Sequence, residues 1–174
     1  MQLSNNPRVF IRRPIAEDCQ TLLSLHRRNQ DFHFPWTFPP LDESGCQNYI
    51  RRCQNDNFEG LLICCAHHHQ IIGVVNLSQI FYRAFQSAYL GYYADAYFAG
   101  QGLMAEGLHL AINHAFYTLK LHRLEANIQP DNQKSINLVK RLGFRKEGFS
   151  PRYLQLNGKW RDHERWALTT EDWH

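Results

Sequence analysis

The sequence predicts an α/β protein of the α+β kind, in which a mixed central β-sheet is flanked by helices. Short apolar runs bounded by turn residues alternate with segments whose apolar residues recur every three or four positions, in the order β-α-α-β-β-β-α-β-α-β-β. The chain has 174 residues, of which 44% are hydrophobic, enough for one well-formed core. Because no repeat or linker interrupts the pattern, we expect one domain over residues 8–170.

The N-terminal third is expected to hold one strand and two helices. The strand covers Arg8–Arg12, and the first helix opens at residues 16–18. Three aromatic residues and three prolines form a loop at 34–40, and Asp42 or Ser44 can cap the second helix.

The middle of the chain contains two apolar runs, 61–66 and 71–75, on either side of three consecutive histidines at 67–69. Such a cluster can bind a metal, but its place between two strand-like runs favours the exposed turn of a hairpin. We therefore predict no metal site, and expect the next strand at 88–94.

The segment from Tyr89 to Met104 is the most informative part of the chain. It has the pattern of a strand, a turn, the loop Gly100-Gln101-Gly102 and the first turn of an amphipathic helix. Glycines let a backbone approach a ligand closely, and a helix start presents free N–H groups and partial positive charge. The segment is a candidate cradle for a phosphate or pyrophosphate, with ordinary turn chemistry as the alternative.

The segment can be compared with two other nucleotide-binding motifs. A Rossmann fingerprint needs a third glycine where this chain has Ala105, although alanine is sometimes allowed there, and Glu125 stands near the place of the acidic ribose ligand. The Gly-Lys-Ser/Thr of a Walker loop is absent.

The C-terminal third is expected to hold one helix and three strands. A strand at 123–129 precedes a helix over 133–142, which Gly143 ends as a C-cap. An extended run follows at 144–149, and Asn157-Gly158 between strand-like residues indicates a hairpin.

The run from Trp160 to Trp166 alternates in residue type, as a hairpin strand does. Its charged residues are expected on a solvated face, with the two tryptophans packed on the other side.

Charge and cysteine usage exclude several classes of function. A net charge of +3 gives no direct signal for nucleic acid. The five cysteines are odd in number and lack any CxxC spacing, so neither a disulfide framework nor a zinc site is indicated. Cys46 and Cys53 share a helical face with Tyr49 and Ile50, which predicts burial.

No apolar stretch is long enough to span a membrane, and the polar N-terminus lacks signal-peptide character. We expect a soluble cytoplasmic protein that does not bind membranes. The sequence does not indicate an oligomeric state.

Five motifs, taken with the order of elements, point to a known family. They are Phe34-Pro35-Trp36, Gly100-Gln101-Gly102-Leu103-Met104, Asn132-x-x-Ser135, Arg141-Leu142-Gly143-Phe144 and Trp160-Arg161-Asp162-His163. In these motifs the chain resembles the GNAT superfamily of N-acetyltransferases over nearly its whole length. Within that superfamily it is most similar to the RimJ and RimL type of ribosomal-protein alanine N-acetyltransferases.

The resemblance implies the GNAT fold and acetyl-CoA as co-substrate. The backbone of the strand at Leu90, Gly91, Tyr92 and Tyr93 would bind the acetyl group and the pantetheine arm. The pyrophosphate would lie on the loop formed by Ala99, Gly100, Gln101, Gly102, Leu103 and Met104. Asn127 and Asn132 would contact the pantetheine.

The chain departs from the family pattern at three positions. The pyrophosphate motif usually begins with Gln or Arg and ends in Gly or Ala, where this chain has Ala99 and Met104, so backbone N–H groups would carry more of the binding. Many members carry a tyrosine where this chain has Val139. Rim-like relatives use a serine three residues after the asparagine, which is Ser135 here. Its hydroxyl would donate to the departing thiolate, or would only hydrogen-bond within its own helix.

The general base is not evident from the sequence. Glu106, in the first turns of the coenzyme helix, is the first candidate for this base. A carboxylate there also simply complements the helix dipole. Asp95, His33 and Glu43 are further candidates. Phe34 and Trp36, with their aromatic neighbours, are expected either to line the acceptor site or to form a small satellite core.

The expected function is transfer of an acetyl group to the N-terminal α-amine of a protein, plausibly a ribosomal one. An α-amine has a pKa of about 8, against about 10.4 for lysine, so it needs little help to attack at neutral pH. Related members acetylate other amines, so a small-molecule acceptor such as an antibiotic, a polyamine or an amino acid is one alternative. A CoA-binding module without turnover, acting in ribosome assembly, is the other.

Overall fold

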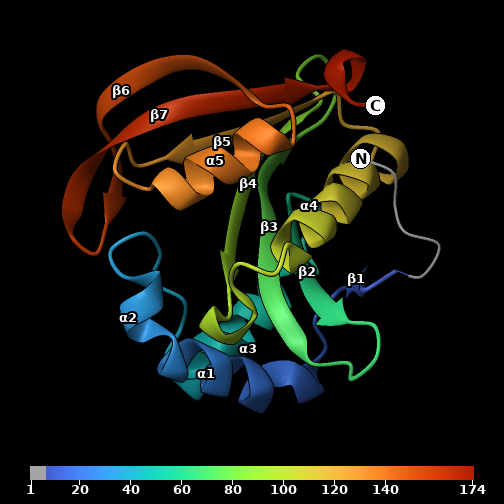
Figure 1. Cartoon of the computed structure of the whole chain (residues 1–174), viewed down its shortest axis with the longest axis vertical. Helices are drawn as coiled ribbons and strands as arrows, with labels where there is room; N and C mark the ends of the chain where they lie inside the picture. The colour runs from blue at the N-terminus through green and yellow to red at the C-terminus, as the bar shows by residue number, and fades with distance from the viewer. Residues whose placement is uncertain (1–6) are drawn as a thin grey trace.

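The computed structural model describes residues 7–174, which form seven strands and five α-helices (Figure 1). The strands are β1 (Val9–Arg12), β2 (Phe58–Cys65), β3 (Ile71–Phe81), β4 (Ser87–Ala94), β5 (Arg123–Ile128), β6 (Arg145–Leu156) and β7 (Lys159–Thr169). The helices are α1 (Cys19–Arg28), α2 (Gln30–His33), α3 (Glu43–Arg52), α4 (Leu103–Asn113) and α5 (Gln133–Arg141). None of the helices in this part of the chain is long and apolar enough to cross a membrane.

The strands form one mixed sheet in the order β1-β2-β3-β4-β5-β7-β6. Neighbouring strands are antiparallel except β4 and β5, which are parallel and are connected through α4. This is the helix-flanked mixed sheet that the sequence predicts. It excludes the mostly parallel sheet that a Rossmann fingerprint requires.

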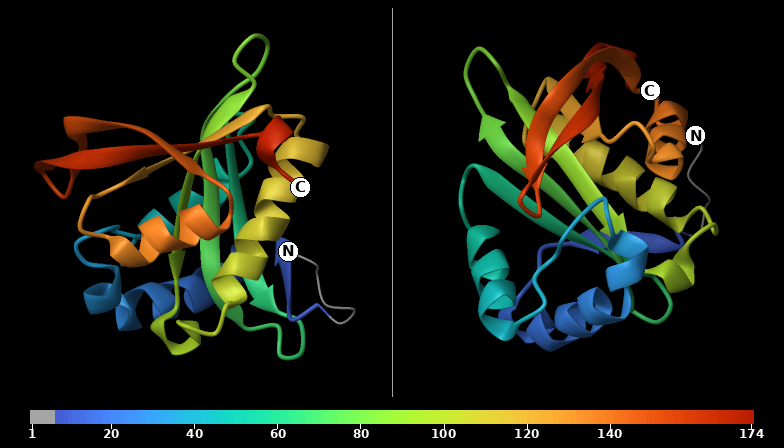
Figure 2. Two further views of the ribbon diagram at one scale, coloured as in Figure 1. Left: turned by 45° about the horizontal axis from the view of Figure 1, so that its top comes forward. Right: turned by 90° about the vertical axis from the view of Figure 1, so that its left-hand side faces the viewer.

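Helices cover both faces of the sheet (Figure 2). On one face α4 and α5 pack their apolar stripes, which include Leu108, Ile112 and Val139, against the sheet. On the other face α1 and α3 cover the first strands through a second core that includes Leu22 and Cys46. Successive strand residues supply the two cores in turn because side chains alternate along a strand. The sheet therefore separates two apolar cores wherever its strands are paired.

Most local predictions are confirmed. Asp42, not Ser44, caps α3, because its Oδ1 accepts from the N–H of Gly45 at 2.7 Å. Gly143 follows α5 at φ +88°, and Asn157 with Gly158 forms the β6–β7 turn at positive φ. The three histidines lie between β2 and β3, as predicted.

The cysteines are mostly in the interior. The predicted burial of Cys46 and Cys53 is confirmed, and Cys19 and Cys64 are buried as well. Burial raises the pKa of the Cys46 thiol to about 12.

Three elements differ from the prediction. The one-turn helix α2 lies between α1 and the aromatic loop, and β3 continues to Phe81 instead of ending at Val75. Trp166 is 4% exposed, as expected, but the predicted packing of Trp160 is wrong, since it is 60% exposed. The reason is that β5 pairs with β7 only up to Glu164, so the tip of the β6–β7 hairpin extends past the covered sheet.

The sheet opens between its two parallel strands. β4 and β5 pair only where Ser87–Tyr89 lies beside Arg123–Glu125. Farther along, β4 stays paired with β3 up to Ala94 and β5 stays paired with β7 up to Ile128, but the two strands no longer pair with each other (Figure 1). The sheet thus has an internal gap bounded by two strand edges.

We predict that Gly107→Ala destabilises the fold without touching this gap. A Cβ at Gly107 of α4 would lie 2.4 Å from Cδ1 of Ile63 on β2, so helix and sheet would have to separate. Overpacking of this kind costs about 1 to 3 kcal/mol, and the better helix propensity of alanine offsets only part of it. Urea unfolding should show a lower midpoint, whereas the exposed control Gln20→Ala in α1 should stay within about 0.5 kcal/mol of the wild type. Equal midpoints for Gly107→Ala and wild type would contradict the close approach of α4 to β2.

Candidate active site

Two cavities meet at the gap between β4 and β5. One has a volume of about 550 Å³ and the other of about 140 Å³. Both are lined by Trp36, Thr37, Tyr92, Asn132 and Ser135. The larger cavity adds Asp31, Phe32, His33, Tyr93, Ala94, Met104, Asp131, Gln133, Lys134 and Leu138. The smaller adds Leu90, Gly91, Asn127, Ile128, Gln129 and His163.

The smaller cavity reaches through the sheet. Leu90 and Tyr92 point toward the core under α4 and α5, whereas Tyr93, and hence Gly91, belongs to the opposite face. On β5, Ala126 and Ile128 point toward α4 and α5, so Asn127 between them faces the other way. The smaller cavity therefore connects the α5 side of the sheet with its opposite face.

One edge of β4 is free along this cavity. From Leu90 to Tyr93 the strand keeps β3 on one side but has no paired β5 residue on the other. Free N–H and C=O groups on a strand edge can bind an extended, amide-containing ligand as an added strand would. The structure thus brings the four predicted strand residues to an edge suited to the pantetheine arm.

The predicted pyrophosphate loop directly precedes α4, and its two glycines adopt left-handed backbone conformations. Gly100 has φ +77° and Gly102, the N-cap of α4, has φ +80°, conformations that glycine adopts without strain. Gly100, Gln101 and Gly102 are exposed, and Met104 lines the larger cavity. The first N–H groups of α4 are available to an anion here.

Arg8 lies beside this loop, and no sequence motif predicts it there. Its Nη1 donates to the Gln101 carbonyl at 3.2 Å, and its Nε donates to Glu106 Oε1 at 2.8 Å. The positive charge of Arg8 adds to the partial charge of the helix start. Glu106 is held in this ion pair and lines neither cavity, so no contact supports its predicted role as base.

Ser135 and Asn132 lie together at the start of α5. Asn132 is the N-cap, and its Oδ1 accepts from the N–H of Ser135 at 3.2 Å. The Ser135 hydroxyl lies 2.6 Å from the Tyr92 hydroxyl, and Tyr92 also donates to the Ser135 carbonyl at 3.3 Å. Burial raises the pKa of Tyr92 to about 12, so its phenol stays protonated at neutral pH. Among the described residues the partner of the Ser135 hydroxyl is Tyr92, outside its own helix, and Ser135 lines both cavities, so the geometry is compatible with the predicted role of a donor to the thiolate.

The aromatic residues of the 34–40 loop differ in whether they line the cavities. Trp36 lines both cavities, whereas Phe34 is 60% exposed and packs edge-on against Phe38 with ring centroids 6.2 Å apart. Of the two residues expected at the acceptor site, only Trp36 reaches the junction of the cavities.

None of the three other candidate bases presents a free acceptor atom to the smaller cavity. Asp95 caps the turn after β4 and is bonded by Arg28 and Asn29, and Glu43 is an exposed residue of α3. His33 lines the larger cavity, but its Nε2 donates to the Ala94 carbonyl at 2.8 Å, and its Nδ1 is sealed in the interior without a partner.

His163 was missed as a site residue. It is 2% exposed and lines the smaller cavity, although it lies among charged residues that were expected on a solvated face. Alternation along the strand does predict that residue 163 lies on the face opposite Trp166. What the sequence could not show is that the hairpin curls over that face.

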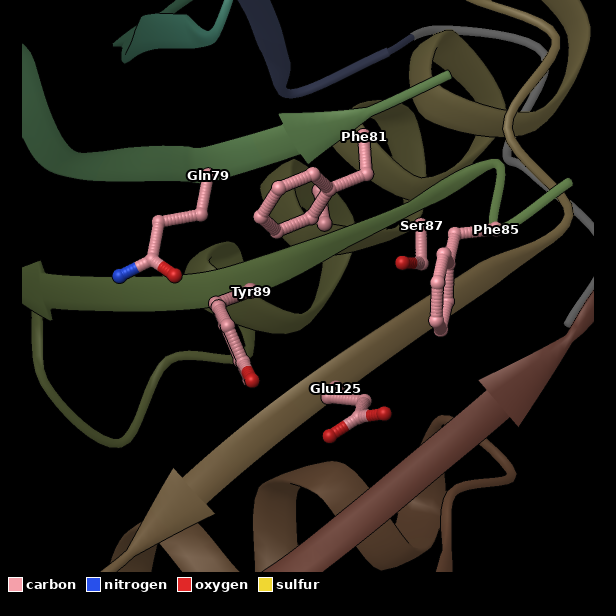
Figure 3. Close-up of a pocket in the computed structure, with 7 residues that line it drawn as sticks. Gln79, Phe81, Phe85, Ser87, Tyr89 and Glu125 are labelled. Atoms are coloured by element: carbon pink, nitrogen blue, oxygen red, sulfur yellow. The ribbon is translucent and has the colours of Figure 1, made fainter. Parts of the chain in front are cut away.

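A third cavity lies farther along the same face of the sheet. It measures about 180 Å³ and contains Phe81, Phe85, Tyr89 and Glu125 around its walls (Figure 3). Tyr89 and Glu125 stand two residues before Gly91 and Asn127 on their strands, so all four share a face. An extended ligand leaving the smaller cavity along this face would meet the third one.

Comparison with known proteins agrees with this geometry. A family model described as an acetyltransferase (GNAT) domain matches residues 8–145. The [ribosomal protein uS5]-alanine N-acetyltransferase of Escherichia coli (strain K12) is 36% identical over 177 residues, which cover 95% of this chain and 90% of that protein.

Two solved structures share the fold. The ribosomal-protein-S5-alanine acetyltransferase of Vibrio fischeri superposes with a TM-score of 0.86 at 27% identity and covers 98% of each chain. The RimJ protein of Mycobacterium smegmatis, solved in complex with CoA-disulfide, superposes with a TM-score of 0.85 at 25% identity, over 94% of this chain and 82% of that one.

Proposed function

The chain belongs to the GNAT family of acetyltransferases, and we propose that its acceptor is the N-terminal α-amine of a protein, in particular a ribosomal protein. It is an N-acetyltransferase, and acetyl-CoA is its acetyl donor. The proposal concerns the acceptor and the residues that serve it. A ribosomal acceptor would also place the enzyme in the cytoplasm.

The observation that carries the proposal is the composition of the smaller cavity. Among the described residues that line it, none is acidic. A polyamine or an aminoglycoside presents several positive charges, which a binding site normally meets with carboxylates. A protein N-terminus presents one amine, and Asn127, Gln129 and His163 offer neutral polar groups for it. Asp42 caps α3 and lines neither of the two cavities.

The third cavity supports a peptide over a single amine. A chain extending from the smaller cavity over Tyr89 would reach the exposed side chain of Phe85, which is 76% exposed. Aromatic side chains bind peptides by large apolar contact at low entropic cost. A small amine would fill the smaller cavity and leave these residues unused.

For the coenzyme, we propose the roles that the sequence suggested. The free edge of β4 from Leu90 to Tyr93 binds the acetyl group and pantetheine arm, with Asn127 and Asn132 as further contacts. The loop Ala99–Met104 and the start of α4 bind the pyrophosphate through backbone N–H groups, assisted by Arg8. Arg8 compensates for the missing basic side chain at Ala99.

For the acid, we propose Ser135. When the thioester lies in the gap, the Ser135 hydroxyl donates to the sulfur that leaves as a thiolate. Tyr92 holds this hydroxyl from the other side at 2.6 Å. Because Tyr92 comes from β4 and Ser135 from α5, the pair also spans the two elements that bound the coenzyme site.

The first test is a thiol-release assay with acetyl-CoA and a panel of amines. Peptides beginning with Ala or Ser should be acetylated, whereas spermidine and an aminoglycoside should not. A peptide beginning with Met and a blocked Ala peptide serve as controls for terminal-residue preference and for lysine acetylation. Turnover of only the small amines would keep the reaction and overturn the proposed acceptor.

Ser135→Ala should lower kcat by about 100-fold and leave the Kd for CoA nearly unchanged, because a general acid typically contributes 10²–10⁴-fold. Steady-state kinetics and calorimetry measure the two quantities. Ser44→Ala, an exposed serine in α3, is the matched control. Full activity of Ser135→Ala would remove the hydroxyl from the mechanism and leave it the role of a helix residue.

Phe85→Ser should raise KM for an Ala-initiated hexapeptide by about fivefold, the loss of an aromatic contact of about 1 kcal/mol, while kcat stays constant. The KM for an Ala-initiated dipeptide, too short to reach the third cavity, should not change. Tyr117→Ser removes another exposed aromatic residue, which follows α4 and is 60% exposed, and should affect neither substrate. Equal effects of Phe85→Ser on both peptides would argue against a peptide path along this face.

A further inference from the structure

One buried histidine in the active site has a ring nitrogen that forms no hydrogen bond with residues 7–174. His163 of β7 is 2% exposed, and it lines the smaller cavity. A residue this buried that lines a cavity has its accessible surface inside that cavity. Any group that His163 can contact besides protein must therefore occupy the space beside Ser135 and Asn132.

The backbone fixes the tautomer of this histidine. Nδ1 lies 2.9 Å from the Arg161 carbonyl oxygen, which can only accept, so Nδ1 carries the proton and donates. In the neutral ring Nε2 then holds a lone pair. Among the described residues Nε2 has no hydrogen-bond partner, and unlike Nδ1 of His33 it is not sealed from accessible space. His163 thus presents a proton acceptor to the cavity.

The surroundings of the ring keep it neutral. Burial lowers the pKa of His163, and this outweighs the Arg161 carbonyl and the charge of Asp162, which both raise it. Tyr153 of β6 packs against the ring at 6.3 Å between centroids, and Ser150 is its cross-strand neighbour. Asp162 also accepts from the N–H of Arg152, so its charge is already partly engaged.

Asn127 is a second polar residue of this cavity, but its Oδ1 is not open to a ligand. Like Nδ1 of His33, this oxygen is sealed from accessible space, and it accepts no hydrogen bond from the described residues. Of these buried acceptors, His163 Nε2 is therefore the one that an incoming amine can reach.

We propose that His163 Nε2 is the general base that takes the proton from the acceptor amine in the gap between β4 and β5. The inference rests on the proposed function for the position of the amine, but it holds for any amine that enters by the smaller cavity. It places base and acid on different elements of the site, with His163 on strand β7 and Ser135 on helix α5.

At pH 7 the α-amine arrives largely as the ammonium, and His163 Nε2 takes one proton from it and releases that proton to solvent. The neutral amine nitrogen then forms the new C–N bond to the thioester carbonyl carbon, and the C–S bond breaks as the tetrahedral intermediate collapses. The nitrogen loses its second proton at this stage, and the CoA thiolate, which accepts a hydrogen bond from Ser135, takes up one proton. The products are the neutral amide and CoA thiol, with one net proton released to solvent.

The test compares His163→Asn with the wild type between pH 6.5 and 9.5, on whichever amine the wild type acetylates. Asparagine keeps a donor for the Arg161 carbonyl and removes the base. At pH 7, kcat/KM should fall by about 100-fold, as expected for loss of a general base. The deficit should shrink to a few-fold at pH 9.5, where an α-amine of pKa about 8 arrives unprotonated. The Kd for CoA should not change.

A structural role would give a deficit that is the same at every pH, or a weaker Kd for CoA, and either result would overturn the proposal. His109→Asn is the matched control, since His109 is a buried histidine of α4 outside both cavities. Turnover of spermidine alone would contradict the proposed acceptor, yet the same pH comparison would still decide the role of His163.

A second measurement needs no acceptor and no variant. Nitrogen-15 NMR of the histidine rings in the CoA complex should show His163 as the Nδ1–H tautomer, unprotonated at Nε2 at pH 7. A doubly protonated ring, or a proton on Nε2, would overturn the proposal even if no amine in the panel is acetylated.

Discussion

The active site depends on the short pairing of two parallel strands. β4 and β5 share three residue pairs and then separate, while β3 and β7 hold their outer edges. A strand edge in the interior of a sheet normally has a partner, because unpaired backbone N–H and C=O groups are costly when buried. Here the unpaired edges face cavities, so a ligand can complete the hydrogen bonding that the missing strand pairs would have supplied.

The remaining structure keeps this gap open and furnishes it. α4 and α5 are anchored by a shared core on one face, so their N-termini stay fixed beside the gap. The loop between α2 and α3 brings Trp36 to the junction from one side, and the β6–β7 hairpin brings His163 from the other. The chemistry is thus assembled from elements that are distant in sequence around one defect in the sheet.

Local chemistry explains what the sequence could predict. The Asp42 cap of α3, Gly143 at the end of α5 and the Asn157-Gly158 turn each depend on a few neighbouring residues, and each prediction is confirmed. Arg8 and Glu106 are 98 residues apart, and their ion pair depends on how β1 lies beside α4. The position of His163 depends on the curl of a hairpin. The predicted packing of Trp160 was wrong for the same reason. Alternation predicts which face of a strand a residue occupies, but not where the covered part of the sheet ends.

The gap through the sheet has a consequence for the order of events. If the coenzyme occupies the α5 side and the amine arrives from the opposite face, neither ligand blocks the entrance of the other. Both can be bound at once, so the acetyl group can pass directly without first being stored on the protein. After transfer, CoA and the acetylated chain have separate exits, and slow release of one does not trap the other.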